Sequence, residues 1–192
     1  MTWNAVVAAL DDGDTFRSRV SVYLHPLAGR PILWHVVQAL TEVTPPPSRV
    51  RVLHRASIAM SLPEAWPVPV DAEAVDGDVE LVSLRAAVTA PGLCLLVDGA
   101  APLLTAATFA RLLRAGEGGV AALPDRREDA GYLAVGGEGP ALASADDPRL
   151  PNGVLRVAAT STDELLRVTD RHTLSDASVA MRDRLIRRHE AA

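Results

Sequence analysis

The stretch LCLLV at residues 93–97 is an unbroken apolar run that stops abruptly at Asp98 and Gly99. A short apolar run bounded by turn residues is typical of a buried strand. Helical spacing of apolar residues begins shortly afterwards, over 105–116, with Thr105 as the expected N-cap. A buried strand that gives way within a few residues to a helix is a building unit of α/β folds.

The same alternation recurs along the rest of the chain. Strands are expected over 4–10, 49–54, 67–70, 93–97, 119–123 and 154–160. Helices are expected over 31–43, 79–90, 105–116 and 170–190, with a short strand and turn over 21–31 and a short helix from Ser161. This order indicates an α/β fold with a mostly parallel, mixed sheet flanked by helices. No internal repeat or linker is evident, so we expect a single domain over residues 1–192.

Two parts of the chain give more local predictions. Residues 124–153 are rich in Gly, Pro and Asp, which predicts loops with one or two short strands. In the last helix, helical spacing predicts that Leu174, Leu185 and either Val179 or Met181 face the core.

The composition places the chain among globular proteins, since 48% of its residues are apolar and 22% are charged. Its net charge of −5 argues against a nucleic-acid partner. No apolar run approaches the ~20 residues of a membrane span, and the N-terminal residues lack the pattern of a signal peptide. Cys94 is the sole cysteine and is predicted to be a core residue. Together these features predict a cytoplasmic protein without a membrane partner.

All 19 basic residues are arginine, because the sequence contains no lysine. No chemical step in this protein can therefore use a lysine side chain.

In parallel α/β sheets, ligands bind at the carboxyl ends of the strands. The loops that follow the first strand, over 10–20, and the strand 93–97, over 98–104, are therefore the expected ligand site. Asp98 lies in the second of these loops. Its carboxylate is suited to binding a metal ion or to closing a turn, and the residues alone leave both interpretations open.

Four stretches carry a resemblance to a known family. PLAGRPILWHVVQAL at 26–40 is similar to the segment after the nucleotide loop in nucleotidyltransferases with a Rossmann-like fold. SLRAAV at 83–88 resembles their serine-x-arginine helix start, and VDGAAPLLT at 97–105 resembles the strand end that carries their metal aspartate. RVTDRHTL at 167–174 is similar to the segment that leads into their last helix. Within this family the chain most resembles the 2-C-methyl-D-erythritol 4-phosphate cytidylyltransferases of isoprenoid biosynthesis.

The resemblance implies a Mg²⁺-assisted transferase that uses CTP or another NTP, a small phosphorylated acceptor and pyrophosphate release. It implies Mg²⁺ on Asp98, and it leaves open a homodimer. The residues implied to bind the nucleotide are Ala8, Ala9, Gly13, Ser83, Arg85 and Asp98. Those implied to act in catalysis are Arg17, Arg19 and Arg167, and those implied to bind the acceptor are Arg167 and Thr169.

A second resemblance is to the uridylyltransferase half of N-acetylglucosamine-1-phosphate enzymes. It rests on LHPLAGRP at 24–31 and on VTDRHTLSDASVAMRDRLIRRH at 168–189. In that alignment the metal aspartate falls on Ala100 instead of Asp98. The motif at 83–88 and the position of Asp98 favour the cytidylyltransferases.

The loop after the first strand departs from the family pattern. Gly13 is present, but the first loop glycine falls on Asp11, the arginine on Thr15 and the lysine on Val22. Arg17 and Arg19 are the available substitutes. These changes support two alternatives to the cytidylyltransferase hypothesis. One is a catalytically inactive relative that binds a ligand or a protein, and the other is a sugar-1-phosphate nucleotidyltransferase.

Overall fold

The computed structural model describes most of the chain. The described residues are 2–10, 16–18, 20–58, 60, 66–77, 93–116, 120–123, 132–135, 155–157 and 159–190. The predicted helix over 79–90 lies outside these residues, as does most of the stretch 124–153.

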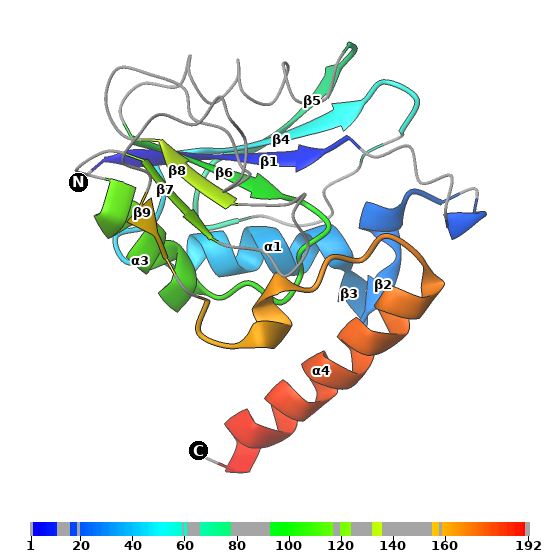
Figure 1. Cartoon of the computed structure of the whole chain (residues 1–192). Coiled ribbons are helices and arrows are strands. Elements are labelled where there is room, and N and C mark those ends of the chain that lie inside the picture. The colour runs from blue at the N-terminus through cyan, green and yellow to red at the C-terminus, as the bar shows by residue number, and fades with distance from the viewer. Residues whose placement is uncertain are drawn as a thin grey trace.

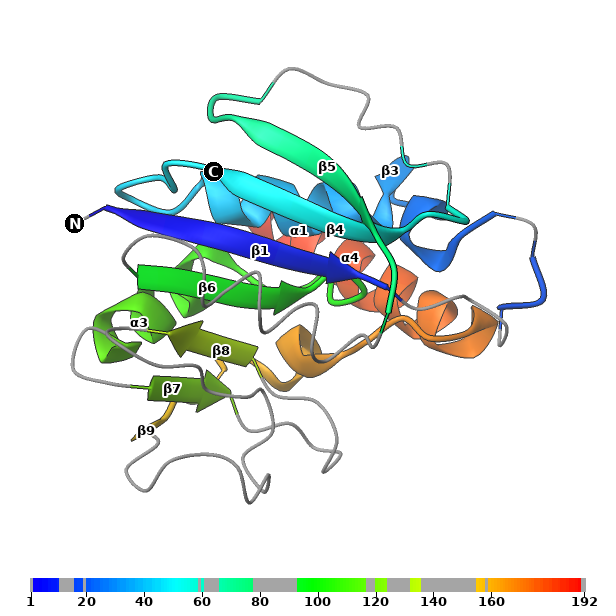
Figure 2. The same cartoon turned by 90° about the horizontal axis from the view of Figure 1, so that it is seen from above.

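Four parallel strands form one half of the sheet (Figures 1 and 2). They are β1 (Trp3–Ala9), β4 (Val50–Arg55), β5 (Val70–Val75) and β6 (Leu93–Asp98). In the order β5-β4-β1-β6, every neighbouring pair is parallel. The carboxyl ends of β1, β4 and β6 therefore meet at one edge, which we call the carboxyl edge.

The other half of the sheet makes it mixed. It consists of β7 (Val120–Leu123), β8 (Tyr132–Val135) and β9 (Leu155–Arg156). Strand β8 is antiparallel to both β6 and β7, whereas β9 is parallel to β7. The full order among the described residues is β5-β4-β1-β6-β8-β7-β9, which confirms the expected α/β fold with a mostly parallel, mixed sheet.

Two helices, α1 (Ile32–Thr41) and α3 (Ala106–Gly116), lie side by side against one face of this sheet (Figure 1). Helix α1 presents Ile32, Val36 and Leu40 to the core at helical spacing, and each is fully buried. Pro31 occupies its N-cap position with a φ of −56°, which proline favours. Residues before α1 form the short 3₁₀ helix η2 (Val22–Leu24) and the hairpin of β2 (Pro26–Leu27) and β3 (Arg30–Pro31).

The C-terminal part consists of the 3₁₀ helix η3 (Thr162–Leu165) and the long helix α4 (Arg171–Glu190). Helix α4 runs below α1 and extends away from the body of the protein (Figure 1). Met181 is buried, as one of the two sequence alternatives predicted. The prediction for Leu185 was wrong, because its side chain is 49% exposed and Val179 is similarly exposed. The second half of α4 extends beyond the core, so helical spacing alone could not show which of its residues are buried.

Two predicted strands differ from the structure in extent. The stretch 67–70 was expected to be a strand, but β5 begins only at Val70, where backbone pairing with Val50 starts. Pro67 and Pro69 lack the amide proton that a strand ladder requires. Of the strand expected over 154–160, the described residues that form a strand are Leu155–Arg156, which make up β9.

Candidate functional site

Asp98 is the last residue of β6 and stands at the carboxyl edge opposite Ala8 of β1. Its Oδ1 atom accepts a hydrogen bond of 2.8 Å from the backbone N–H of Ala100, which closes a tight turn. The side chain is 19% exposed, so it lies at the rim of the core. One carboxylate oxygen of Asp98 therefore closes a turn, as one of the two sequence interpretations predicted.

Gly99 allows this turn to lie close to β1. Its backbone N–H donates a hydrogen bond of 2.8 Å to the carbonyl of Ala8. A Cβ atom at this position would lie 3.0 Å from that same oxygen and 3.3 Å from carbons of Leu33 and Tyr23. Glycine is thus favoured here because a side chain would crowd a backbone oxygen and two core side chains.

The second oxygen of Asp98 is bound by Arg167. The Arg167 Nε–H donates to Asp98 Oδ2 across 69 positions of sequence, and the two side chains form an ion pair. Arg167 is placed there because the backbone N–H of the next residue, Val168, donates a 2.8 Å hydrogen bond to the Ala100 carbonyl. The structure thus brings together two predicted site residues from separate motifs.

The fit of a metal ion to Asp98 can be tested on this geometry. Both carboxylate oxygens already accept hydrogen bonds, one of them from a cation. At ~4 Å and an effective dielectric near 20, a divalent ion and a guanidinium repel by about 8 kcal/mol, which opposes part of the attraction of the carboxylate. Among the described residues, no group of three His, Cys, Asp or Glu side chains could hold a metal. Ala100, the metal position of the second resemblance, carries no ligand atom on its side chain. The described residues therefore do not form a site that holds magnesium through protein side chains alone, and Asp98 is already paired with a guanidinium.

The other predicted nucleotide contacts are placed unequally. Ala8 lies beside Asp98 at the end of β1, while the side chain of Ala9 is fully buried in the core. Only backbone atoms of Ala9 are therefore suited to contacting a ligand. The remaining predicted contacts lie outside the described residues: Gly13, Arg19, Ser83 and Arg85.

Arg17 and Thr169 are described: Arg17 follows β1 in the chain, and Thr169 lies just before α4. Arg17 is exposed and has a φ of +47°, a left-handed conformation that is uncommon for residues other than glycine. Its neighbour Phe16 is buried and packs against the ring of His25 in a tilted arrangement with ring centroids 4.4 Å apart, so the residue before Arg17 is anchored in the core. The backbone N–H of Thr169 donates to Thr173 Oγ1 at 3.0 Å, which ties it to the start of α4.

Val22 marks the clearest departure from the family pattern. The resemblance places a lysine at this position, but the valine side chain is 1% exposed and packs in the core. Its neighbour in η2, Tyr23, is also buried. Position 22 in this chain therefore supplies packing and no cation.

Arg55 is a cation at the carboxyl edge that the sequence prediction missed. It ends β4, and its guanidinium donates to the carbonyl of Leu10 at 3.2 Å and to the carbonyl of Gly77. The end of β4 is adjacent to the end of β1, since His54 pairs with Ala9. The signal in the sequence was an arginine directly after a predicted parallel strand.

Glu164 is the second missed residue, and it is 1% exposed. Its carboxylate accepts hydrogen bonds of 2.6 Å from the hydroxyls of Thr105 and Thr108, and one of 2.9 Å from the backbone N–H of Thr160. Buried carboxylates are stable only when hydrogen-bonded in this way. The network fixes η3 against the start of α3, three residues before Arg167.

Two further residues, Arg184 and Cys94, belong to elements around the site. Arg184 of α4 donates a 2.7 Å hydrogen bond to the carbonyl of Leu103, and burial lowers the pKa of its guanidinium below the ordinary value. Cys94 lies within β6, and burial raises the pKa of its thiol to about 12. It is thus a protonated core residue at neutral pH, as the sequence predicted.

Comparisons with known proteins show which proteins this chain is similar to. A model of the MobA-like NTP transferase domain matches residues 23–180. The bifunctional protein GlmU of Rubrobacter xylanophilus is 34% identical over 163 residues, which cover 77% of this chain and 35% of that protein. The chain thus spans about a third of the length of this curated relative. None of the described helices is long and apolar enough to cross a membrane.

Solved structures extend the likeness to the whole fold. The 4-diphosphocytidyl-2C-methyl-D-erythritol synthase of Anaerococcus prevotii superposes with a TM-score of 0.68 at 12% identity, covering 94% of this chain and 96% of its own. The 2-C-methyl-D-erythritol 4-phosphate cytidylyltransferase of Thermus thermophilus gives 0.63 at 16% identity, covering 95% and 100%. Both resemblances found in the sequence are confirmed at the level of family and fold. With most of its length matched by the family model, the chain belongs to the MobA-like NTP transferase domain family.

Proposed function

We infer that this chain is a nucleotidyltransferase that binds a nucleoside triphosphate at the carboxyl edge and transfers the nucleotidyl group to a small phosphorylated acceptor. The observation that carries this proposal is the contact of Arg167 with Asp98 at the end of β6. It places a guanidinium at the edge where ligands bind in parallel sheets.

The proposed reaction joins two anions. A phosphate oxygen of the acceptor attacks the α-phosphorus of the nucleotide, a new P–O bond forms, and the bond to the bridging oxygen of pyrophosphate breaks. Negative charge accumulates on the phosphoryl oxygens, and fixed cations stabilise it best when they are already oriented. Arg167 is held in place by Asp98, and Arg55 is fixed at the end of β4. Arg17, Arg19 and Thr169 remain proposed contributors.

CTP with methylerythritol phosphate is the first substrate pair that we propose. It is supported by SLRAAV at 83–88, by the position of Asp98 and by the likeness of the fold to two cytidylyltransferases. UTP with N-acetylglucosamine 1-phosphate is the second pair, supported by the sequence similarity to GlmU. In this proposal Gly13, Ser83 and Arg85 contact the nucleotide, residues 1–192 act as one domain, and the protein is cytoplasmic.

A catalytically inactive binding module is the alternative from another class. One observation favours it: the buried Val22 stands where the family places a lysine, so one phosphate-binding cation is replaced by a core side chain. Such a protein is expected to bind nucleotide, or a protein partner, without releasing pyrophosphate.

Calorimetric titration of the full chain with CTP and UTP, followed by an assay of pyrophosphate release with both acceptors, tests these proposals. Arg167→Ala is expected to weaken nucleotide binding by about 10- to 100-fold, because a charge-assisted hydrogen bond contributes about 1.5–3 kcal/mol. Arg49→Ala is the matched control. Arg49 forms an ion pair of 2.6 Å with Asp71, beside the opposite ends of β4 and β5.

Binding with pyrophosphate release supports the transferase, and the preferred acceptor selects the substrate pair. Binding without release supports the inactive module. Absence of binding by any nucleoside triphosphate at millimolar concentration contradicts the proposed nucleotide site, as does equal loss of affinity in Arg167→Ala and Arg49→Ala.

A further inference from the structure

We propose that Asp98 in this chain is the carboxylate that positions Arg167, and that the anionic ligand is bound through arginine without a divalent cation on Asp98. This inference rests on the proposed function and deepens it. It names the ligand form at the site as the metal-free phosphate or polyphosphate anion.

Both oxygens of the Asp98 carboxylate accept a hydrogen bond from another part of the chain. Oδ1 accepts the Ala100 N–H at 2.8 Å, and Oδ2 accepts the Arg167 Nε–H. A backbone amide and a guanidinium thus approach the two oxygens from separate segments of the chain. A divalent cation on Oδ2 would have to displace this guanidinium or lie against it, and the two positive charges would repel.

The segment that carries Arg167 is held in place on both sides of this residue. Three residues before it, Glu164 is buried and hydrogen-bonded to Thr105 and Thr108. One residue after it, the Val168 N–H is bound to the Ala100 carbonyl at 2.8 Å. The backbone of Arg167 is therefore held beside Asp98 by contacts that do not depend on the ion pair. A metal ion that displaced the Arg167 side chain from Asp98 would still lie close to this arginine, because the backbone keeps the residue there. The two positive charges would then repel each other.

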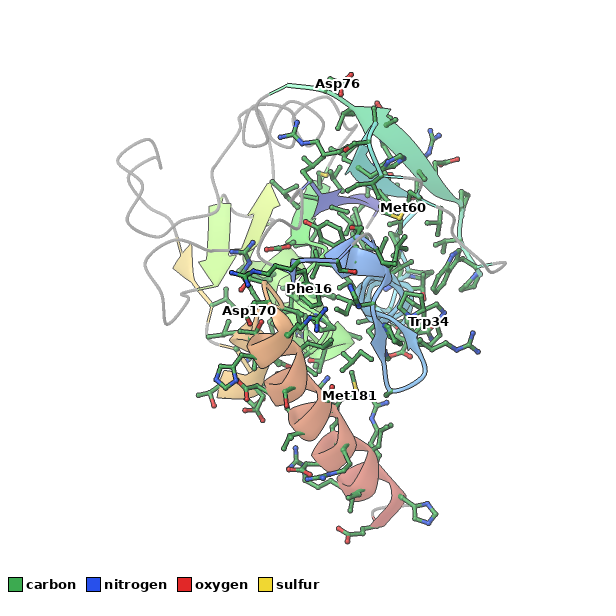
Figure 3. All side chains as sticks on the ribbon, turned by 90° about the vertical axis from the view of Figure 1, so that its right-hand side faces the viewer. Phe16, Trp34, Met60, Asp76, Asp170 and Met181 are labelled. Carbon is green, nitrogen blue, oxygen red and sulfur yellow. The ribbon has the colours of Figure 1, made fainter. Side chains whose placement is uncertain are left out.

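The described residues place a second arginine at this edge, and arginine is suited to binding phosphate. Arg55 at the end of β4 adds a guanidinium group from another segment, and the exposed Arg17 follows β1 in the chain. Figure 3 looks onto this edge, with Phe16, the anchored neighbour of Arg17, near the centre and Asp170 at the start of α4. Guanidinium groups bind phosphate oxygens through pairs of hydrogen bonds. Magnesium instead coordinates phosphate oxygens directly and takes its other ligands from carboxylates and water. Arginine is thus able to neutralise a phosphate that a metal ion would otherwise bind.

Titration of the full chain with CTP and UTP in excess EDTA, and again in excess magnesium chloride, tests the proposal. The variants are Asp98→Asn, Arg167→Ala and the double variant, with Arg49→Ala as the control. Asparagine retains an oxygen for the Ala100 N–H but removes the charge that holds Arg167. Direct titration of each nucleotide-free protein with Mn²⁺, followed by electron paramagnetic resonance, measures metal binding independently.

The expected result is nucleotide affinity in EDTA that equals or exceeds the affinity in magnesium. Asp98→Asn and Arg167→Ala are each expected to lose about 10- to 100-fold in EDTA, and the double variant no more than Arg167→Ala alone, because the two residues act as a unit. Mn²⁺ binding is expected to be the same in the wild type and in Asp98→Asn.

Two outcomes would overturn the proposal. One is affinity that rises tenfold or more in magnesium and loses that rise in Asp98→Asn, since removing a metal ligand or its support costs about 10- to 100-fold in metal affinity. The other is Mn²⁺ binding that is lost in Asp98→Asn. Failure of the chain to bind nucleotide in either buffer contradicts the proposed function, and the Mn²⁺ titration still decides whether Asp98 is a metal ligand.

Discussion

The backbone N–H of Val168 donates a hydrogen bond of 2.8 Å to the carbonyl of Ala100. This bond lays the segment before α4 against the turn after β6, and it places Arg167 opposite Asp98. The pair therefore joins two distant motifs at the carboxyl edge, where their contribution to folding is measurable apart from any ligand.

A double-mutant cycle on Asp98 and Arg167 is expected to show a coupling free energy of about 1–2 kcal/mol in urea unfolding. This value lies between those of exposed pairs and of fully buried pairs, because the side chains are 19% and 34% exposed. The same cycle on the more exposed Arg49 and Asp71 is expected to give about 0.2–1 kcal/mol. Equal coupling free energies in the two cycles would show that the partial burial of Asp98 and Arg167 does not strengthen their ion pair.

Glu164→Ala is expected to lower the free energy of unfolding by about 3 kcal/mol, because it leaves buried hydroxyl and amide groups without an acceptor. Glu164→Gln retains one carbonyl oxygen and is expected to cost less, about 1–2 kcal/mol. Glu42 is a matched control, since it is exposed and accepts a 2.9 Å hydrogen bond from Gln38. Chemical denaturation checks these values, and a loss in Glu42→Ala as large as that in Glu164→Ala contradicts them.

Asp170 caps α4, and its contribution is expected to depend on pH. Its Oδ1 accepts the Thr173 N–H at 2.8 Å, and this hydrogen bond, followed by the one from the Thr173 hydroxyl, lowers the pKa of Asp170 below its ordinary value of 3.8. Because the native pKa is below the unfolded one, the stabilisation is fully present above the unfolded pKa. It is lost as the pH falls through the native pKa.

Asp170→Ala is accordingly expected to cost about 1 kcal/mol at neutral pH, the usual value for an N-cap. The difference from the wild type should shrink as the pH falls below 3.8, by the part of the stabilisation that depends on the charge of Asp170. Asp176→Ala, at an exposed position within α4, serves as the control. A penalty for Asp170→Ala that is constant from neutral pH into acid would contradict the assigned role of its charge.

Gly99→Ala is expected to destabilise the protein by about 1–3 kcal/mol, because overpacking against fixed atoms forces the backbone to shift. The added Cβ would meet the Ala8 carbonyl at 3.0 Å, and that backbone atom belongs to a central strand. Gly29 offers a contrast, since a Cβ there meets nothing within 4 Å and only its φ of +82° disfavours other residues.

For Gly29→Ala the expected cost is therefore about 1 kcal/mol, from left-handed strain alone. Thermal or urea unfolding of both variants distinguishes the two causes. A larger penalty at Gly29 than at Gly99 would mean that steric contact with Ala8 is not what requires glycine after Asp98.

The sequence by itself determined the succession of strands and helices, since local hydrophobic period and turn residues are sufficient to recognise them. The run 93–97 became the core of β6, and Asp98 stands at the carboxyl edge because parallel strands share that edge. The motif matches likewise indicate the correct family without reference to the fold.

Tertiary structure alone decided what surrounds Asp98. Its partner Arg167 is 69 positions away, and Glu164 reaches Thr108 across 56 positions, so no local pattern encodes either contact. The prediction of the inner face of α4 was wrong at Leu185 for the same reason. Leu185 has the helical spacing of a core residue, but among the described residues no neighbours cover it. A side chain's type and spacing follow from the sequence, whereas its partners depend on how distant segments pack. That packing made Asp98 the partner of an arginine.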